Sequence, residues 1–420
     1  MLPAPPLSDA ERARGRRLAV ASNVPAMTFW TAFTGQLPTL ALISLGASET
    51  LIGLQGGLHI GLQALQLPAL RLVSWFSKRS ILIAGQLFAQ AASLPLVFFA
   101  LIAGLERDTA VAIVFAALAL TAVGLDFSDL VWFPLLRGFV DPDRIGRFFG
   151  VIRTTWHVAV VLFFIGGQLW LQRNDGAFGA LFGVAWLLGV VRLFLIARLP
   201  ERSERTTARI RAREAIALVR ANRQLRLYLI GVCWGNALRV AVVTFALVML
   251  RRGLGFDNAQ VVYTTIAHFL GGLVSLYLWG ALIDRVGAYV VFRTCALASA
   301  ALYLGLAQLD TPGSATLLAA IAFFFLNALF GAGYGVADTR VLFELAPPEA
   351  PARTLVVASV AVGIVCGVAP ALIGAALDPL LARATDPLPV YHGFFWTAAA
   401  LQAVSFLPLR VFARSRSDSA

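Results

Sequence analysis

Apolar runs of about 20 residues recur along the whole chain, and short clusters of charged residues, Gly and Pro separate them. Each run is long enough to cross the hydrocarbon core of a bilayer as an α-helix. The only polar interruption between the first two runs is the segment 46–50. The pattern predicts twelve transmembrane helices, at residues 22–46, 51–70, 79–104, 110–136, 147–171, 177–197, 226–250, 259–282, 288–308, 314–337, 354–378 and 390–412.

The composition supports this pattern. Hydrophobic residues make up 59% of the 420 residues and charged residues only 13%, against about 45–50% and about 25% in ordinary soluble domains. A water-soluble fold could not bury that much apolar surface. The predicted class is therefore an all-α polytopic membrane protein, and the first run is too long to be a removable signal peptide.

The positive charge follows the predicted topology. A net charge of +12 would suit a nucleic-acid partner, but the 34 Lys and Arg residues lie between apolar runs and form no basic domain. Most of them fall on one side of the predicted membrane, which is the cytoplasmic side by the positive-inside rule. We therefore expect an even number of helices, both termini in the cytoplasm, a place in the cell (inner) membrane, and no nucleic-acid partner. The opposite loops hold only Arg107, Arg173, Arg251, Arg252 and Arg383.

One long polar segment divides the chain almost in half. It predicts an N-terminal six-helix bundle at 1–198, a cytoplasmic linker at 199–225 and a C-terminal six-helix bundle at 226–420. Within the linker, apolar residues recur at helical spacing, which fits either a basic amphipathic helix on the cytoplasmic leaflet or a solvated linker. These apolar residues are Ile210, Ala217, Leu218, Ala221 and Leu225.

The two halves resemble each other. A shift of 209 positions aligns the cytoplasmic end of the fourth predicted helix with that of the tenth. It places Gly124 on Gly333, Asp129 on Asp338, Pro142 on Pro351 and Arg144 on Arg353. These identities in corresponding loops indicate duplication of a six-helix unit. Parallel repeats of this kind place a solute site at their interface, near the bilayer midplane.

Two loop segments resemble signatures of a known family. The segment 280–287, with the sequence GALIDRVG, resembles the G-x-L-x-D-R-x-G loop of the major facilitator superfamily, and 144–150, RIGRFFG, is similar to its R-x-G-R-x-x-G stretch. In the first half the 209 shift brings Asp284 onto Trp75, so that copy of the loop is degraded. The resemblance implies a bacterial transporter of twelve helices in two pseudo-symmetric bundles. Helices one, four, seven and ten would line a central cavity, and helices two, five, eight and eleven would form the contact between halves.

The chemistry of the surviving loop suggests a latch. Gly280 and Gly287 permit a tight turn, and Asp284, which precedes Arg285, can pair with Arg340 at the end of the tenth helix. Such a pair would hold the cytoplasmic side shut, although a structural turn with a surface charge is the competing interpretation. Two further pairs are predicted to act in the same way, Asp129 with Arg144 and Asp338 with Arg353.

A few ionisable residues lie at membrane depth, where such groups cost about 2.5–3.5 kcal/mol and turn towards a cavity or a partner. Arg239 lies in the seventh predicted helix and needs a counter-anion, either Asp126 of the fourth helix or an anionic group on the solute. His59, His157 and His268 lie in helices two, five and eight. They can couple proton movement to transport, because histidine titrates near neutral pH, or serve as packing residues.

Aromatic and amide residues supply a candidate solute pocket. Trp30 and Gln36 share a stripe of the first helix with Phe29 and Phe33. Asn236 and Tyr263 lie on the seventh and eighth helices, and the same residues could equally serve helix packing. With few buried carboxylates and many aromatics, an amphipathic or weakly charged solute is favoured over a sugar.

These observations together predict a secondary active transporter that moves a small solute by alternating access, coupled to protons or another ion. No G-x-x-x-x-G-K-[ST] motif points to ATP, and no catalytic cluster points to an enzyme. The three cysteines lie in apolar runs without metal-ligand spacing, so we expect no metal. We also expect no cofactor and a monomer. A membrane-embedded enzyme and a lipid-handling or sensory protein on the same scaffold remain the alternatives.

Overall fold

The protein is described by a computed structural model. The structure describes residues 7–65, 69, 72, 75–136, 138–140, 145–201, 212–346 and 351–414. Every regular element within these residues is a helix. The chain divides into two compact units, of which unit 1 comprises residues 1–47 and 65–209 and unit 2 comprises residues 48–64 and 210–420.

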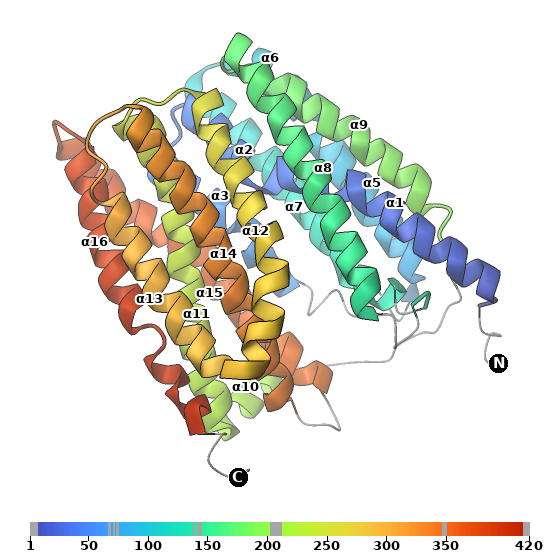
Figure 1. The fold of residues 1–420 in the computed structure, drawn as a ribbon. Coiled ribbons are helices and arrows are strands. Elements are labelled where there is room, and N and C mark those ends of the chain that lie inside the picture. Colours follow the sequence, from blue (N-terminus) through green and yellow to red (C-terminus); the bar gives the residue numbers. More distant parts are fainter. Residues whose placement is uncertain are drawn as a thin grey trace. The chain divides into compact units, whose positions relative to one another are not determined.

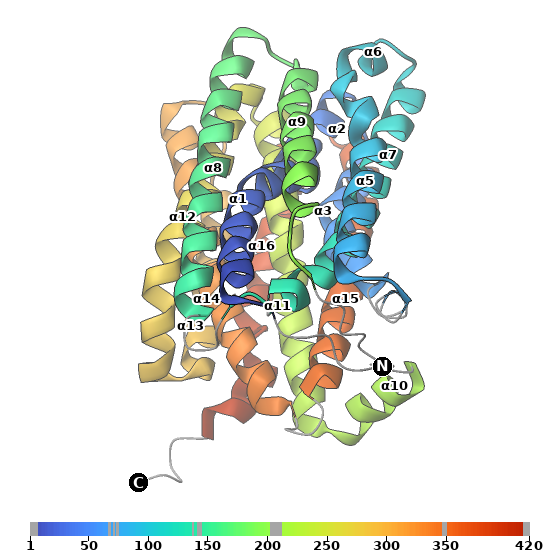
Figure 2. The same ribbon diagram turned by 90° about the vertical axis from the view of Figure 1, so that its right-hand side faces the viewer.

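Unit 1 is a bundle of helices in which α1 packs against both α8 and α9 (Figure 2). Its helices α5 and α7 also pack closely, and small residues explain the short distance between them. A Cβ atom on Gly85 would lie 2.7 Å from the carbonyl oxygen of Gly124. The helices of unit 1 are α1 (Asp9–Thr34), α2 (Gln36–Ser44), α5 (Lys78–Val97), α6 (Phe99–Ala103), α7 (Arg107–Leu136), α8 (Ile145–Arg173) and α9 (Phe178–Ile196).

Unit 2 is also a helical bundle, in which α12 lies beside α14 and α13 beside α16 (Figure 1). Its core is rich in aromatic residues, among them Tyr228, Phe292 and Tyr334. The helices are α3 (Glu49–Leu62), α10 (Ala212–Ala221), α11 (Arg223–Val248), a π-helical turn (Met249–Gly253), α12 (Asn258–Val286), α13 (Ala288–Leu306), α14 (Ser314–Leu345), α15 (Pro351–Arg383), α16 (Leu388–Val404) and a final 3₁₀ segment (Leu407–Arg414). A short 3₁₀ turn (Gln63–Leu65) follows α3.

The predicted all-α polytopic class is confirmed. In the part of the chain that the structure describes, each of the twelve predicted ranges coincides with helix. Among the described residues, nine helices are long and apolar enough to cross a membrane, and the bent pair Asn258–Ser275 and Leu278–Val286 makes ten if it is one span. The first two predicted spans fall short of this criterion by themselves, because one is divided at Gly35 and α3 is only 14 residues long.

The predicted start of the first helix at residue 22 is wrong. α1 begins at Asp9, because Ser8 and Glu11 form a capping box that satisfies two free N–H groups of the first turn. An apolar run marks only the membrane-length part of a helix, so the polar extension before it was missed. The same helix stops at Gly35, where a Cβ atom would lie 2.5 Å from the carbonyl oxygen of Thr31.

The described part of the linker contains a helix. α10 covers Ala212–Ala221 and packs against α11 and α15. Its place near the ends of these two helices is visible in Figure 2. The first apolar residue of the predicted stripe, Ile210, lies outside the described residues. A position of this helix on the cytoplasmic leaflet stays a prediction.

Glycines allow α3 to pack directly on the backbone of α15. A Cβ atom on Gly53 would lie 2.2 Å from the carbonyl oxygen of Pro370, and one on Gly57 would lie 2.4 Å from that of Gly367. Backbone atoms cannot swing aside as side chains do, so only glycine permits this approach. The second predicted span thus belongs to unit 2 through its contact with α15, and the domain limits 1–198 and 226–420 stay predictions.

Substitution of Gly57 by alanine is expected to destabilise the packing of α3 on α15. The added methyl group forces the helices apart, and overpacking of this kind costs about 1–3 kcal/mol. The free energy of unfolding, measured by SDS titration in mixed micelles, would fall by that amount. Gly393→Ala is the matched control, because a Cβ atom on Gly393 meets nothing within 4 Å. Equal stability of the two variants would contradict the backbone contact.

Candidate functional site

The strongest candidate site in unit 2 surrounds Arg239. This residue lies near the middle of the 31-residue span Arg223–Gly253, at the depth where a charge is most costly. Its side chain is partly exposed, but the Nη1 atom is buried and has no hydrogen-bond partner among the described residues. The guanidinium carbon lies 5.2 Å from the centre of the Tyr334 ring, within cation–π distance.

Glycines hold the Arg239 and Tyr334 side chains in place. The Tyr334 hydroxyl donates to the carbonyl oxygen of Gly231 over 3.0 Å. A Cβ atom on Gly235 would lie 2.7 Å from the same hydroxyl, and one on Gly331 would lie 3.2 Å from Arg239 Nη2. The Tyr334 ring and the Arg239 guanidinium therefore occupy space that side chains at positions 235 and 331 would fill.

Asp338 lies one turn beyond Tyr334 on α14 and completes this cluster. The hydroxyl of Tyr228, a buried residue of α11, donates a hydrogen bond to its carboxylate. Asp338 interacts electrostatically with Arg239. Among the described residues, however, no carboxylate oxygen lies within the 4.0 Å ion-pair distance of Arg239. The described contacts of Asp338 are thus with α11, while the side chain of its predicted partner Arg353 lies outside the described residues.

The residues of the predicted aromatic pocket are divided between the two units: those of the first predicted helix belong to unit 1, and Asn236 and Tyr263 belong to unit 2. Phe29 and Phe33 are buried in unit 1, where Phe33 stacks on Phe182 at 5.3 Å, so these two residues serve helix packing. Trp30 and Gln36 are partly exposed on the same stretch. In unit 2, Asn236 on α11 is partly exposed and lies one turn from Arg239.

Tyr263 is less deeply enclosed than the other predicted pocket residues. Its side chain on α12 is 37% exposed. His268, on the same helix, is partly exposed and contacts the neighbouring Phe269 edge-on at 5.7 Å. A role in solute binding for either residue stays a prediction.

The other two histidines differ in their surroundings. His157 is 7% exposed, and its Nδ1 lies 2.7 Å from the carbonyl oxygen of Arg153, one turn earlier in α8. Its ring also stacks on Trp156 at 3.6 Å, which is the environment of a packing residue. His59 lies on α3 and is partly exposed.

Unit 1 contains a buried charge cluster near the end of α7. Asp126 is 3% exposed, and Leu65, Ala69, Val123 and Phe127 line a small space beside it. Asp126 belongs to unit 1 and Arg239 to unit 2, so their pairing stays a prediction.

Asp129 lies one turn after Asp126, and its electrostatic partner in the described residues is Arg192 of α9. Arg192 is only 4% exposed and interacts with Asp129 in return. The predicted partner, Arg144, lies outside the described residues. By its position near the end of a predicted helix, Arg192 resembles the cytoplasmic arginines that set the orientation, yet it is a buried residue of unit 1.

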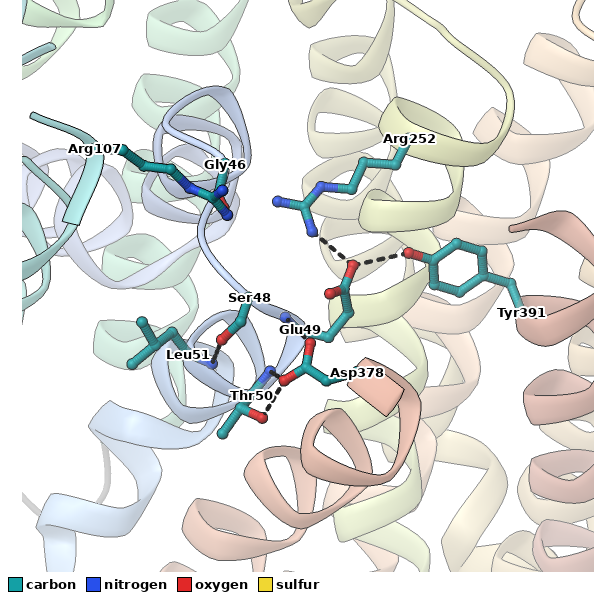
Figure 3. A network of polar contacts seen from close by, with 9 residues as sticks. All are labelled: Gly46, Ser48, Glu49, Thr50, Leu51, Arg107, Arg252, Asp378 and Tyr391. Atoms are coloured by element: carbon teal, nitrogen blue, oxygen red, sulfur yellow. Dashed lines mark hydrogen bonds and ion pairs between the residues drawn. The ribbon is translucent and has the colours of Figure 1, made fainter. Parts of the chain in front are cut away.

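A second polar centre fastens the beginning of α3 within unit 2 (Figure 3). The Glu49 carboxylate accepts from Arg252 Nη1 over 2.6 Å and from the Tyr391 hydroxyl over 3.0 Å. Glu49 and Tyr391 are both buried, at 7% and 1% exposure, so this is a largely desolvated ion pair.

Asp378, on α15, caps the same helix end. Its carboxylate accepts from the backbone N–H of Glu49 over 2.8 Å, from that of Thr50 over 3.1 Å, and from the Thr50 hydroxyl. Free N–H groups and the positive end of the helix dipole both favour a carboxylate there. We call the five residues Glu49, Thr50, Arg252, Asp378 and Tyr391 the α3 lock.

The loop segment 280–287 forms the predicted pair of Asp284 with Arg340, but it turns at only one of its two glycines. Arg340 Nη1 lies 3.1 Å from Asp284 Oδ1 and also 3.1 Å from the carbonyl oxygen of Ile283. The prediction of a turn at Gly280 is wrong, because α12 continues through it to Val286. Gly287 alone makes the turn, with φ +82°, a conformation that favours glycine. Arg285 is exposed.

The α3 lock was missed in the sequence because its charges lie at the ends of apolar runs. Arg252 counted only as a loop charge for the orientation, and Glu49 only as punctuation between two spans. The one local signal is the order Ser48, Glu49, Thr50, which resembles the start of a helix: Ser48 is the N-cap of α3 and accepts from the Leu51 N–H. Nothing in the local sequence links that helix start to Asp378.

Comparison with known proteins agrees with this architecture. The family model described as Major Facilitator Superfamily matches residues 227–420. A variant of the nucleoside transporter NupG has a similar structure, with a TM-score of 0.75 at 12% identity, over 94% of this chain and 99% of that one. No curated protein sequence matches the chain.

Two further solved structures are similar over nearly their whole length. A D-xylose–proton symporter has a TM-score of 0.69 at 14% identity, over 94% of this chain and 97% of that one. A POT family transporter in complex with 5-aminolevulinic acid has a TM-score of 0.72 at 13% identity, over 95% and 96%. At these identities the likeness concerns the fold.

The helices, their apolar spans and these structural matches define the class: the chain is a multi-pass membrane protein with the major facilitator fold. The sequence match over its C-terminal half confirms the predicted resemblance to major facilitator superfamily transporters.

Proposed function

We propose that this protein is a secondary active transporter that moves a small solute across the inner membrane by alternating access, with both termini in the cytoplasm. The observation that carries the proposal is the partly exposed Arg239 at mid-span in a chain with the major facilitator fold. A charge held at that depth is costly unless it faces a cavity or a partner. Its cation–π partner Tyr334 and its neighbour Asp338 provide the walls of a polar site within unit 2.

The α3 lock supplies the second element of the proposal, a gate. In the proposed orientation, α3 begins on the outer side, so the five lock residues fasten the outer end of unit 2. Release of α3 from α15 would open that end to the outside. The Asp284–Arg340 pair lies near the C-terminal ends of α12 and α14, which are cytoplasmic in the proposed orientation. This pair would act on the cytoplasmic side.

Reconstitution tests the transport function directly. Purified protein in proteoliposomes is expected to exchange a labelled solute down its gradient without ATP, and to accumulate it when a proton or sodium gradient of the right sign is imposed. Empty liposomes provide the baseline, and Gly393→Ala, where the added Cβ atom meets nothing within 4 Å, provides a variant that should transport like wild type. Hydrolysis of a solute, or lipid movement without solute flux, would contradict the proposal.

The cytoplasmic pair is expected to contribute little. The side chains of Asp284 and Arg340 are 79% and 38% exposed, and exposed ion pairs are worth about 0.2–1 kcal/mol. Asp284→Asn should therefore change the flux by less than about fivefold. Arg293→Gln, which removes an exposed charge from α13, is the control. A complete loss of flux in Asp284→Asn alone would show that this pair is a principal gate.

A further inference from the structure

Arg239 has hydrogen-bonding capacity that the protein leaves unused. Its Nη1 is buried without a hydrogen-bond partner among the described residues, although a guanidinium presents five N–H donors. A buried unsatisfied donor is destabilising, and more so when it carries charge. The residue as a whole is partly exposed, so an incoming group has an approach to the guanidinium.

The surroundings of Arg239 fix its orientation without a direct ion pair among the described residues. The Tyr334 ring lies 5.2 Å from the guanidinium carbon, and that ring is fastened by its hydrogen bond to the Gly231 carbonyl. The absence of a side chain at Gly331 lets α14 pass close to Nη2, where a Cβ atom would lie 3.2 Å away. A planar guanidinium held near a ring, with a donor that lacks a partner, is suited to bidentate recognition of a planar oxyanion.

The nearby acid explains which anion would fit. Asp338 accepts the hydrogen bond of Tyr228 and lies beyond ion-pair distance of Arg239 among the described residues, yet the two interact electrostatically. The site therefore offers one fork of donors with a negative charge close behind it. Asp338 repels any incoming anion, and it opposes the two charges of a phosphate dianion more strongly than the single charge of a monoanion, so a monoanion is favoured between the two.

The rest of the cluster is weakly polar. The buried side chains of Tyr303, Cys295 and Cys366 lie close enough to Arg239 for electrostatic interaction. Thiols and phenols are weakly polar groups that pack like apolar side chains. The surroundings favour a solute with an apolar or aromatic body behind its charged group.

We propose that the solute is a monocarboxylate with an apolar or aromatic body, and that Arg239 binds its carboxylate in a bidentate manner; this inference rests on the proposed transport function. Tyr334 orients the guanidinium, and Asp338 selects against dianions. Binding satisfies the free N–H groups of Arg239, so the site gains stability when it is occupied.

Matched ligand pairs test the carboxylate assignment on the purified full-length protein. The probes are phenylacetate against phenylacetamide, hexanoate against hexanamide, and phenylphosphonate as the dianion at pH 8. Thermal melting is expected to shift upwards with the carboxylates and not with the amides or the phosphonate. No shift with any carboxylate, or equal shifts with acid and amide, would overturn the assignment in the wild-type protein without any variant.

Variants then assign the effect to Arg239. Arg239→Gln is expected to weaken carboxylate binding by about 10- to 100-fold, the range for a lost charge-assisted hydrogen bond. Arg239→Lys, which keeps the charge and loses the fork, should retain part of the affinity. Arg223→Gln removes a charge from the exposed start of the same helix and should bind like wild type. Recovery of wild-type properties in Asp126→Asn/Arg239→Gln would show that Arg239 serves as a counter-ion and overturn the proposal.

Flux measurements separate this inference from the proposed function. One possible result is that carboxylates bind in an Arg239-dependent manner but no bound carboxylate crosses the membrane of proteoliposomes. That result would support the anion site and contradict the transport function. A second possible result is a flux of uncharged solutes that is the same in wild type and in Arg239→Gln. That result would support the transport function and overturn the carboxylate site. Saturable carboxylate flux that Arg239→Gln reduces at least 10-fold is the result that supports both.

Discussion

Replacement of Glu49 by Gln together with Asp378 by Asn is expected to release α3 and to expose the surface beneath it. The readout is a cysteine at position 244 in a protein whose three native cysteines have been replaced. Thr244 is 5% exposed, and its hydroxyl lies beneath Gly56 of α3, where a Cβ atom would approach it to 2.2 Å. The rate of alkylation of this cysteine by a membrane-impermeant maleimide should rise at least 10-fold.

The size of this effect follows from the α3 lock. Asp378 accepts three hydrogen bonds from Glu49 and Thr50, and the buried Glu49 carboxylate accepts two more from Arg252 and Tyr391. Hydrogen bonds to charged groups are worth about 1.5–3 kcal/mol each. Removal of both charges while the amides preserve shape therefore shifts the opening equilibrium by more than the 1.4 kcal/mol that corresponds to a factor of 10.

A matched acid at the same end of the bundle controls for charge. Asp386 lies between α15 and α16, and among the described residues it accepts only the local N–H of Leu388, over 3.0 Å. Asp386→Asn should leave the alkylation rate at position 244 unchanged. An unchanged rate in Glu49→Gln/Asp378→Asn as well would show that the glycine contact of α3 with α15 suffices to hold this end closed.

Replacement of Arg192 by Met is expected to lower the stability of the protein by about 1–3 kcal/mol, the range for a desolvated group that loses its nearby partner. Arg192 is 4% exposed in α9 and interacts electrostatically with Asp129 of α7. Met fills a similar volume, so the loss arises from the carboxylate left without its cation and not from a cavity. The free energy of unfolding by SDS titration measures the loss.

A second substitution distinguishes this pair from general damage to α9. Asp129→Asn in the Arg192→Met background removes the uncompensated charge and is expected to restore more than half of the lost stability. Arg198→Gln, an exposed residue just beyond the same helix, should have no measurable effect. An additive loss in the double variant would indicate that Arg192 contributes through packing alone.

The span pattern could be predicted well because membrane insertion depends on each segment by itself. Lipid satisfies no backbone hydrogen bonds, so an apolar run of sufficient length must form a helix wherever it lies. The polar ends of helices escaped this reasoning, as the capping box at Ser8 and the uninterrupted passage of α12 through Gly280 show. Arg239 could be singled out in advance because a charge within a span is conspicuous in sequence alone.

Charges near the ends of spans were harder to interpret. In sequence, Arg192 and Arg252 resemble the loop arginines that set the orientation. Only the packing of the helices brings Arg192 near Asp129 and Arg252 onto Glu49. Their partners are distant in the chain: Asp378 caps a helix end 329 residues before it. Hydrophobic patterning encodes which segments enter the membrane and leaves the pairing of their ends unspecified.

The sequence by itself determined that this protein is a helical, multi-pass membrane protein with a loop signature ending at Gly287 and one arginine in the middle of a span. The tertiary structure alone decided that Tyr334 lies against Arg239 and that Glu49 and Asp378 fasten α3. The physical reason is that burial in lipid is a property of each segment's own residues, whereas hydrogen bonds and ion pairs between helices depend on how closely glycines let those helices approach.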